Sequence, residues 1–281
     1  MADSEFLVSS QGVRIPRILY GTAWKKSRTQ ELVRTAIQRG FRGIDTACQP
    51  KHYNEAGVGA AVAACLNDKL GRDDLYLQTK FTPLSGQDPA QVPYDPAAPL
   101  AQQVAQSFAA STKNLQTDHV ECLLLHSALP DRRQMSQVWG AMERIFQDGG
   151  ARQLGISNCY SASALATLYQ AAVVKPAVLQ NRFYAQSGYD RQLREFCREH
   201  AIVYQSFWTL TANPQLLAAD AVTAPAARYA RTPAQILYRY LTQSDIVPLT
   251  GTTSATHMRE DLEIFEFELS TAERAAISAL L

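Results

Sequence analysis

Short apolar runs alternate with amphipathic stretches along the whole chain. The apolar runs are continuous, which is typical of parallel strands buried on both faces. The amphipathic stretches repeat apolar residues three and four positions apart, the period of a helix. The predicted strands are residues 15–20, 41–45, 75–80, 120–126, 151–157, 177–181, 201–207 and 246–250. The predicted helices are residues 28–39, 55–69, 100–115, 134–147, 161–172, 190–199, 233–241, 255–263 and 270–281.

This regular alternation predicts an α/β fold. Strand and helix follow one another without a break in composition, which favours a single domain over residues 1–281. A doubly wound dinucleotide-binding sheet would carry a G-x-G-x-x-G turn after an early strand, and no such turn is found. We therefore expect a (β/α)8 TIM barrel with an N-terminal β-hairpin over residues 5–16 and extra C-terminal helices.

The segment 82–99 departs from the pattern. It contains five prolines, and proline neither donates to a strand ladder nor fits inside a helix. We predict a long loop. Loops of this length in compact domains are usually functional, and the alternative is a floppy surface insertion.

Composition excludes several classes of protein. In 281 residues, 46% are hydrophobic and 19% are charged, as in an ordinary globular protein, and the net charge of +1 favours neither nucleic acid nor a membrane surface. The five cysteines lack C-x-x-C spacing, so neither a disulfide framework nor a zinc site is indicated. Residues 1–5 lack an apolar segment, so we expect no signal peptide. No run approaches the roughly 18 apolar residues of a membrane span, so we expect a cytoplasmic protein.

Polar residues stand at the ends of the predicted strands: Asp45, Lys80, His126, Gln180 and Thr250. Each alone has a structural explanation, because a single histidine is often a hydrogen-bonded core residue and a lysine often extends to solvent. In a barrel, however, all these strand ends open onto one face, so the side chains converge. Together they predict an active site.

Several motifs carry a resemblance to a known family. They are Gly21-Thr22 with Trp24, Gly43-Ile44-Asp45-Thr46-Ala47, Tyr53-Asn54-Glu55 with Gly59, Thr79-Lys80, Leu124-Leu125-His126, Gly155-Ile156-Ser157-Asn158, Gln180-Asn181 and Pro233-Ala234-Gln235. In this order and spacing the sequence resembles the aldo-keto reductase superfamily. The resemblance implies an NAD(P)H-dependent reductase of aldehydes and ketones that uses no metal.

The resemblance implies a catalytic tetrad of Asp45, Tyr53, Lys80 and His126. Tyr53 would be the general acid, although a free tyrosine titrates at about pH 10. We expect the Lys80 ammonium to lower that pKa and Asp45 to hold Lys80 in place. Neutral His126 would donate a hydrogen bond to the carbonyl oxygen.

The resemblance also implies NADPH as the cofactor, with NADH as the alternative. The implied cofactor-binding residues are Thr22, Ser157, Asn158, Gln180, Phe207, Leu210, Thr250, Gly251, Thr252, Thr253, His257 and Asp261. Phe207 stands where the family usually has a tyrosine that stacks on the nicotinamide. Gly251 and His257 stand where NADP-using members have a lysine and an arginine for the 2′-phosphate, which keeps NADH open.

The tyrosine of the tetrad is displaced in this sequence. In the family it usually follows the aspartate by five positions, and Pro50 stands there. Tyr53 lies eight positions on and still precedes the predicted helix, so we assign it as the acid. Lys51 and His52 then become extra groups near the mouth of the site, and we expect them to be solvated.

The substrate is expected to be an apolar or aromatic carbonyl, because Trp24 and Trp208 would wall the pocket. Two alternatives remain at this point. One is a cofactor-binding regulatory subunit of the channel-subunit type with little turnover. The other is a reductase of a biosynthetic imine or ketone. We expect a small-molecule carbonyl substrate and no binding to nucleic acid or to a membrane. We also expect the protein to be a monomer.

Overall fold

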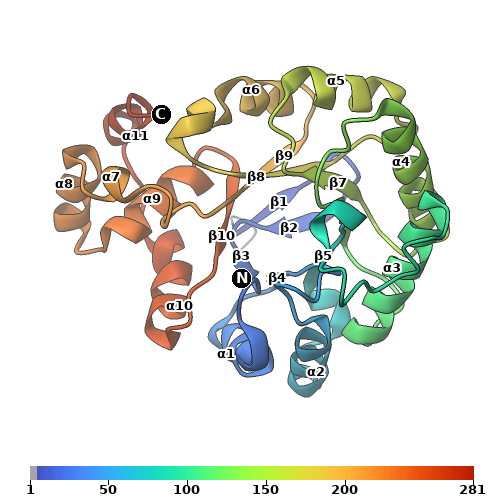
Figure 1. Ribbon diagram of the computed structural model, residues 1–281. Coiled ribbons are helices and arrows are strands. Elements are labelled where there is room, and N and C mark those ends of the chain that lie inside the picture. Colours follow the sequence, from blue (N-terminus) through green and yellow to red (C-terminus); the bar gives the residue numbers. More distant parts are fainter. Residues whose placement is uncertain (1–4) are drawn as a thin grey trace.

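Eight parallel strands close on themselves to form the predicted barrel (Figure 1). The computed structural model describes residues 5–281, so the first four residues, part of the segment expected not to be a signal peptide, lie outside it. The barrel order is β10-β3-β4-β5-β6-β7-β8-β9. The strands are β3 (Leu19–Gly21), β4 (Gly43–Asp45), β5 (Tyr76–Phe81), β6 (Cys122–Leu125), β7 (Leu154–Ser157), β8 (Val178–Arg182), β9 (Val203–Phe207) and β10 (Ile246–Thr250).

The N-terminal hairpin is confirmed, and one strand boundary is corrected. β1 (Phe6–Val8) pairs antiparallel with β2 (Arg14–Pro16). The apolar run at 15–20 was predicted as one strand, but its first part belongs to the hairpin and its last part to β3. Pro16 pairs with Phe6 in the hairpin, and Leu19 pairs with Leu249 in the barrel. The run therefore contributes a strand to each of two sheets.

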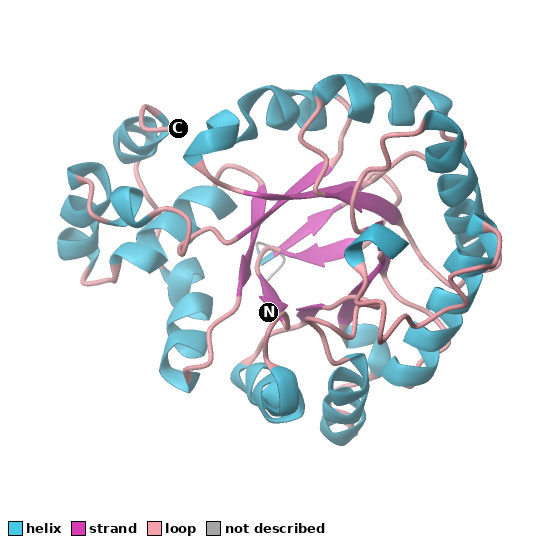
Figure 2. Ribbon diagram, in the orientation of Figure 1, coloured by secondary structure: helices cyan, strands magenta, loops and turns pink. Residues whose placement is uncertain are grey.

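Helices surround the barrel (Figure 2). They are α1 (Thr29–Arg39), α2 (Glu55–Cys65), α3 (Leu100–Leu115), α4 (Arg132–Gln147), α5 (Ala162–Ala171), α6 (Arg191–Glu199), α9 (Pro233–Thr242), α10 (Ala255–Leu262) and α11 (Thr271–Ser278). The main boundary error is α2, which was predicted to reach residue 69. It ends at Cys65 because Leu66 is extended and Asn67 turns back to pair with Leu70.

Two further helices were missed. The sequence predicts no helix between β9 and residue 233, but this stretch contains α7 (Pro214–Leu217) and α8 (Asp220–Tyr229). α8 has Pro225 in its interior, a residue that argues against a helix in a sequence. It nevertheless forms because Val222, Pro225 and Ala226 are buried together.

The interior of the barrel changes character from one end to the other. A cluster formed by strands and the hairpin is apolar and includes Ile15, Leu19, Leu124 and Val178. Toward the carboxyl ends of the strands, buried glutamines, an aspartate and a lysine replace it. The larger apolar cluster lies between the strands and the surrounding helices. Polar groups are thus concentrated at the end where the strand-to-helix loops meet.

The proline-rich segment 82–99 packs against this end of the barrel. Tyr94 is buried, donates a hydrogen bond of 2.8 Å to the Thr82 carbonyl, and lies 5.7 Å from the Phe81 ring between centroids. Gln87 donates to the carbonyls of Cys48 and Thr82. A floppy insertion would lack these contacts, so the segment is an ordered part of the rim.

The five cysteines are free and buried: Cys48, Cys65, Cys122, Cys159 and Cys197. This agrees with the prediction of no disulfide framework. Within residues 5–281, no group of three or more metal-ligating side chains is found. In the same residues, none of the helices combines the length and the apolar composition that crossing a membrane requires.

Candidate active site

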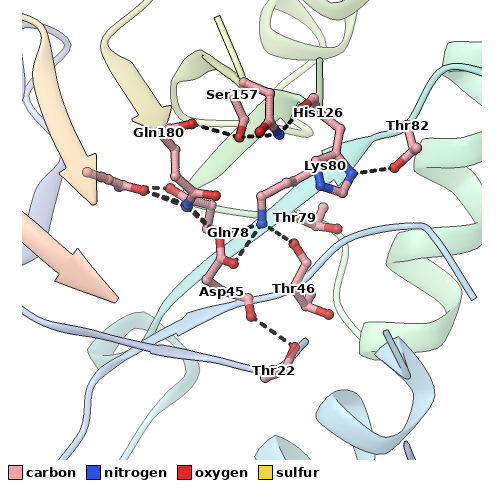
Figure 3. Close-up of polar contacts among 12 residues, drawn as sticks. Thr22, Asp45, Thr46, Gln78, Thr79, Lys80, Thr82, His126, Ser157 and Gln180 are labelled. Carbon is pink, nitrogen blue, oxygen red and sulfur yellow. Dashed lines mark hydrogen bonds and ion pairs between the residues drawn. The ribbon is translucent and has the colours of Figure 1, made fainter. Parts of the chain in front are cut away.

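Lys80 and Asp45 form a buried ion pair at the polar end of the barrel (Figure 3). Lys80 lies on β5 and donates from Nζ to both carboxylate oxygens of Asp45 at 2.7 Å, and to the Thr46 carbonyl at 2.8 Å. Adjacent strands place the two residues side by side, since β4 pairs with β5. All three ammonium protons therefore have acceptors within the protein.

Tyr53 lies near this ion pair. Lys80 Nζ is 5.4 Å from the centroid of the Tyr53 ring, and the His126 ring centroid is 5.9 Å away. The displaced tyrosine thus reaches the other predicted tetrad members despite its longer loop. Asn54 fixes the start of α2 directly after it, because its side chain accepts a hydrogen bond from the Gly57 amide.

The pKa of Tyr53 differs from the expectation. Burial raises it well above the ordinary value, and the negative charge of Asp45 raises it further. We had expected Lys80 to lower it. The physical reason is that burial dominates, and that the Lys80 ammonium is bound directly to Asp45, whose negative charge opposes any lowering by Lys80. Tyr53 is therefore a protonated phenol at neutral pH.

His126 is neutral. Its pKa lies well below the ordinary value because the ring is buried and because the Lys80 and His52 charges oppose protonation. Thr82 Oγ1 lies 2.6 Å from His126 Nδ1, a contact that the sequence did not indicate. A Thr82 hydroxyl that donates to Nδ1 leaves the ring proton on Nε2.

Two glutamines hold the Asp45 carboxylate, and a third joins them. Asp45 Oδ1 accepts hydrogen bonds from Gln78 Nε2 at 2.7 Å and from Gln180 Nε2 at 2.9 Å. Gln205 accepts from both glutamines, so β5, β8 and β9 are joined across the interior. Gln78 and Gln205 were missed. The sequence did carry a signal for them. Gln78 stands two positions before Lys80 and Gln205 two positions before Phe207, so each points to the same side of its strand as a predicted site residue.

A cavity of about 930 Å³ opens above these residues. The predicted residues that line it are Trp24, Asp45, Tyr53, His126, Ser157, Asn158, Gln180, Phe207, Trp208, Leu210, Thr250, Gly251, Thr252, His257 and Asp261. Thr22, Lys80 and Thr253 do not line it. Thr22 donates from its buried hydroxyl to the Asp45 carbonyl, and Lys80 lies beneath the cavity.

The predicted nicotinamide site comes together at the ends of β7, β8 and β9. Ser157 Oγ donates to the Gln180 carbonyl at 2.8 Å, and Asn158 Nδ2 donates to the His126 carbonyl at 2.8 Å. These contacts link the predicted cofactor residues to the predicted catalytic histidine. Phe207 is half-buried and contributes to the cavity wall, so a ring face is available there.

The loop after β10 supplies the other predicted cofactor residues. Thr250 Oγ1 donates to Asp261 Oδ2 at 2.7 Å, and burial raises the pKa of Asp261 to about 6. Lys25, which the sequence reasoning missed, crosses from the loop after β3 and donates to the Gly251 carbonyl. A cation thus lies against the glycine that replaces the expected lysine.

Aromatic side chains stand at the mouth of the cavity. Trp24 is 57% exposed and Trp208 is 46% exposed. The His52 ring lies 3.8 Å from the Trp24 ring between centroids, and Gln49 contacts its Nδ1 at 2.9 Å. His52 is therefore packed, which corrects the expectation that it is simply solvated. Arg182 of β8 also lines the cavity and was missed.

Comparison with known proteins agrees with this geometry. The model of the Aldo/keto reductase family matches residues 17–281. A glyoxal reductase of Bacillus subtilis is 28% identical over 250 residues, which cover 89% of this chain and 82% of the relative. An aldo-keto reductase of Mycobacterium tuberculosis is 30% identical over 253 residues, which cover 90% and 82%.

Solved structures agree as well. The crystal structure of an aldo/keto reductase from Brucella melitensis superposes with a TM-score of 0.82 at 26% identity, and the match covers 98% of this chain and 99% of that one. The match to the family model extends over almost the whole chain, from before β3 to the last residue. The chain therefore belongs to the aldo-keto reductase family.

Proposed function

We propose that this aldo-keto reductase reduces an aldehyde or ketone with NADPH, and that Tyr53 is the proton donor. The observation that carries the proposal is the meeting of Tyr53 and His126 in one cavity directly above the Lys80–Asp45 pair. Bound nicotinamide would supply the hydride. The protein then needs only to orient the carbonyl and to deliver a proton.

Tyr53 suits the role of acid because its proton is held at neutral pH. Reduction of a carbonyl places negative charge on its oxygen, and an alkoxide is more basic than a phenolate. A phenol with a raised pKa therefore still protonates it. Lys80 would limit the cost of the phenolate formed, since its ammonium lies 5.4 Å from the Tyr53 ring.

His126 would orient the substrate. A neutral ring with its proton on Nε2 donates one hydrogen bond to the carbonyl oxygen, and a charged ring would compete with Tyr53 as the acid. Burial keeps the ring neutral, and the contact with Thr82 is compatible with this tautomer. Tyr53 and His126 would together stabilise the developing negative charge.

The residues present fit a dinucleotide. The cavity of about 930 Å³ is near the upper end of the ~300–1,000 Å³ typical of ligand sites, which is large for a small carbonyl alone. Ser157, Asn158, Gln180 and Phe207 would hold the nicotinamide end. Lys25 and the N-terminal end of α10 would favour a phosphate. We keep NADPH ahead of NADH on this ground.

The substrate side would be aromatic. Trp24, the His52 ring beside it and Trp208 form the mouth, so we propose an apolar or aromatic carbonyl. The similar Bacillus subtilis protein is named a glyoxal reductase, and glyoxal is an aldehyde. This likeness supports aldehydes as the first compounds to test.

The test is Tyr53→Phe, which removes the proton and keeps the ring. We expect loss of carbonyl-dependent NADPH oxidation at 340 nm by a factor of about 100 or more, with NADPH binding unchanged in a fluorescence titration. Wild-type activity across a panel of aldehydes and ketones is the reference. A Tyr53→Phe enzyme that stays active would show that another group donates the proton. Tight cofactor binding without turnover by the wild type would favour the regulatory alternative.

A further inference from the structure

Arg182 is held in a fixed position at the wall of the main cavity. It is the last residue of β8, and its guanidinium carbon lies 4.1 Å from the Trp208 ring centroid and 5.4 Å from the Tyr184 ring centroid. Two rings therefore contact one cation. Such stacking restricts the guanidinium while leaving the edges of its planar fork available for hydrogen bonds.

The Trp208 backbone is unusual in a way that supports this position. Its φ angle is 56°, in the left-handed region that bulky residues rarely adopt. Surrounding contacts must compensate for a conformation of this kind. Trp208 directly follows β9, which pairs with β8, so the strained residue places its ring against Arg182.

The Arg182 guanidinium has no acidic partner among residues 5–281. No ion pair or hydrogen bond joins it to another described side chain or carbonyl, and its Nε is buried without an acceptor. By contrast, Arg72 pairs with Glu121, and Arg231 pairs with Glu263. Because Arg182 also lines the cavity, the N–H groups of its guanidinium that lack a partner in the described residues are available to an acceptor carried by a bound molecule.

The strand register places this cation beside the predicted nicotinamide site. Side chains two positions apart on a strand point to the same side, so Arg182 follows Gln180 one step closer to the mouth. Gln180, Asn158 and Arg182 all line the cavity. The buried carboxylate of Asp45, which also lines the cavity, is already bound by Lys80 and two glutamines.

We propose that Arg182 is an anion-binding residue of the cavity, separate from Lys25, and takes a carboxylate or phosphate group of a bound molecule. A guanidinium presents parallel N–H donors that match both groups. This inference rests on the proposed function, which supplies two sources of the anion. One is a carboxylate carried by an aromatic carbonyl substrate, and the other is the pyrophosphate of the cofactor.

Two variants and a matched control test the proposal. Arg182→Gln removes the charge, and Arg182→Lys keeps a charge without the fork. Arg198→Gln makes the same change at an exposed arginine on α6 that contacts Glu195. Thermal unfolding, monitored by circular dichroism, establishes that each variant is folded. If Arg182→Gln is not folded, Arg182→Lys is used in its place.

The readouts separate the two sources. Kinetics compare 4-carboxybenzaldehyde with its uncharged methyl ester, and fluorescence titrations measure binding of NADPH and of terephthalate, which needs no turnover. A substrate carboxylate predicts a rise of about tenfold or more in KM for the acid and in Kd for terephthalate, with the ester and NADPH unchanged. A cofactor pyrophosphate predicts a similar rise in the Kd of NADPH.

The proposal is overturned if Arg182→Gln changes neither the Kd of terephthalate nor the Kd of NADPH by more than about twofold. If only Arg182→Lys folds, the same criterion applies to that variant. It is also overturned if Arg198→Gln has the same effect as Arg182→Gln. A wild-type protein that reduces no carbonyl would refute the proposed function only. The two binding titrations would still decide the role of Arg182, because neither depends on turnover.

Discussion

At the scale of single residues, the cavity favours uncharged forms. Burial raises the pKa of Tyr53 and lowers that of His126, so both groups are neutral near pH 7. The fixed charges below them, Lys80 and Asp45, are paired with each other. At the base of the cavity, the phenol and the imidazole therefore stand as uncharged hydrogen-bond donors above a pair of charges that offset each other.

A pH prediction follows for His126. Its folded pKa lies below the unfolded value of about 6.5, so the unfolded chain takes up a proton first as the pH falls. This residue's contribution to stability is therefore present above pH ~6.5 and is lost as the pH falls below that value. We expect the melting temperature of the wild type to fall more steeply between pH 7.5 and 5, values around that pKa, than that of His126→Gln.

Circular dichroism melts at constant ionic strength measure this difference. His52, whose pKa is also lowered by burial, is present in both proteins and cancels in the comparison. Equal slopes for the wild type and His126→Gln would contradict the assignment of a depressed pKa to His126.

At the scale of elements, close contacts between helices set what the chain tolerates. Gly59 of α2 lies against α3, and an added Cβ would approach the Asn114 carbonyl oxygen to 2.2 Å. That distance is far below van der Waals contact, and the obstacle is backbone. α2 follows Tyr53 directly, so this contact also helps to hold the loop that presents the tyrosine.

Gly59→Ala is expected to destabilise the fold by roughly 2 kcal/mol or more, because the two helices must separate. Gly140→Ala on α4 is the control, since nothing lies within 4 Å of its added Cβ. Alanine there should stabilise the helix by up to ~1 kcal/mol. Urea unfolding gives both free energies. A Gly59→Ala variant as stable as the wild type would show that α2 and α3 adjust freely.

Some elements of this fold could be predicted from the sequence, and others could not. The strands and most helices were predictable because their apolar periods differ. Helix α8 was not, since Pro225 argues against a helix and only burial of its apolar side favours one. Asp45, Lys80 and His126 were recognisable at strand ends. Arg182 was not, because its significance depends on Trp208, a residue distant in sequence.

At the scale of the whole molecule, one polar layer ties the closed barrel together. Asp45, Gln78, Gln180 and Gln205 join four strands through hydrogen bonds of 2.7 to 2.9 Å. The layer lies between the apolar half of the interior and the cavity. A ligand that fills the cavity therefore contacts groups that connect strands far apart in the sequence, and its binding is coupled to the stability of the barrel.

Cofactor binding should accordingly raise the melting temperature. A ligand at one hundred times its Kd adds about 2.7 kcal/mol to the free energy of unfolding, which corresponds to a shift of several degrees. We expect a larger shift with NADPH than with NADH at equal concentration, measured by differential scanning fluorimetry. A larger shift with NADH would reverse the cofactor assignment. The absence of a shift with either would contradict dinucleotide binding.

The buried cysteines can be used to measure local unfolding of the protein in solution. The thiols lie on α2, β6 and α6 and in the loops after β4 and β7, so they sample widely separated parts of the barrel. Burial also raises their pKa values, for example that of Cys48 to about 12 and that of Cys159 to about 11. Alkylating reagents attack the thiolate, which is scarce in the folded state. The rate at which each cysteine is alkylated thus records how often its own region opens, and the native protein carries five built-in probes of local unfolding.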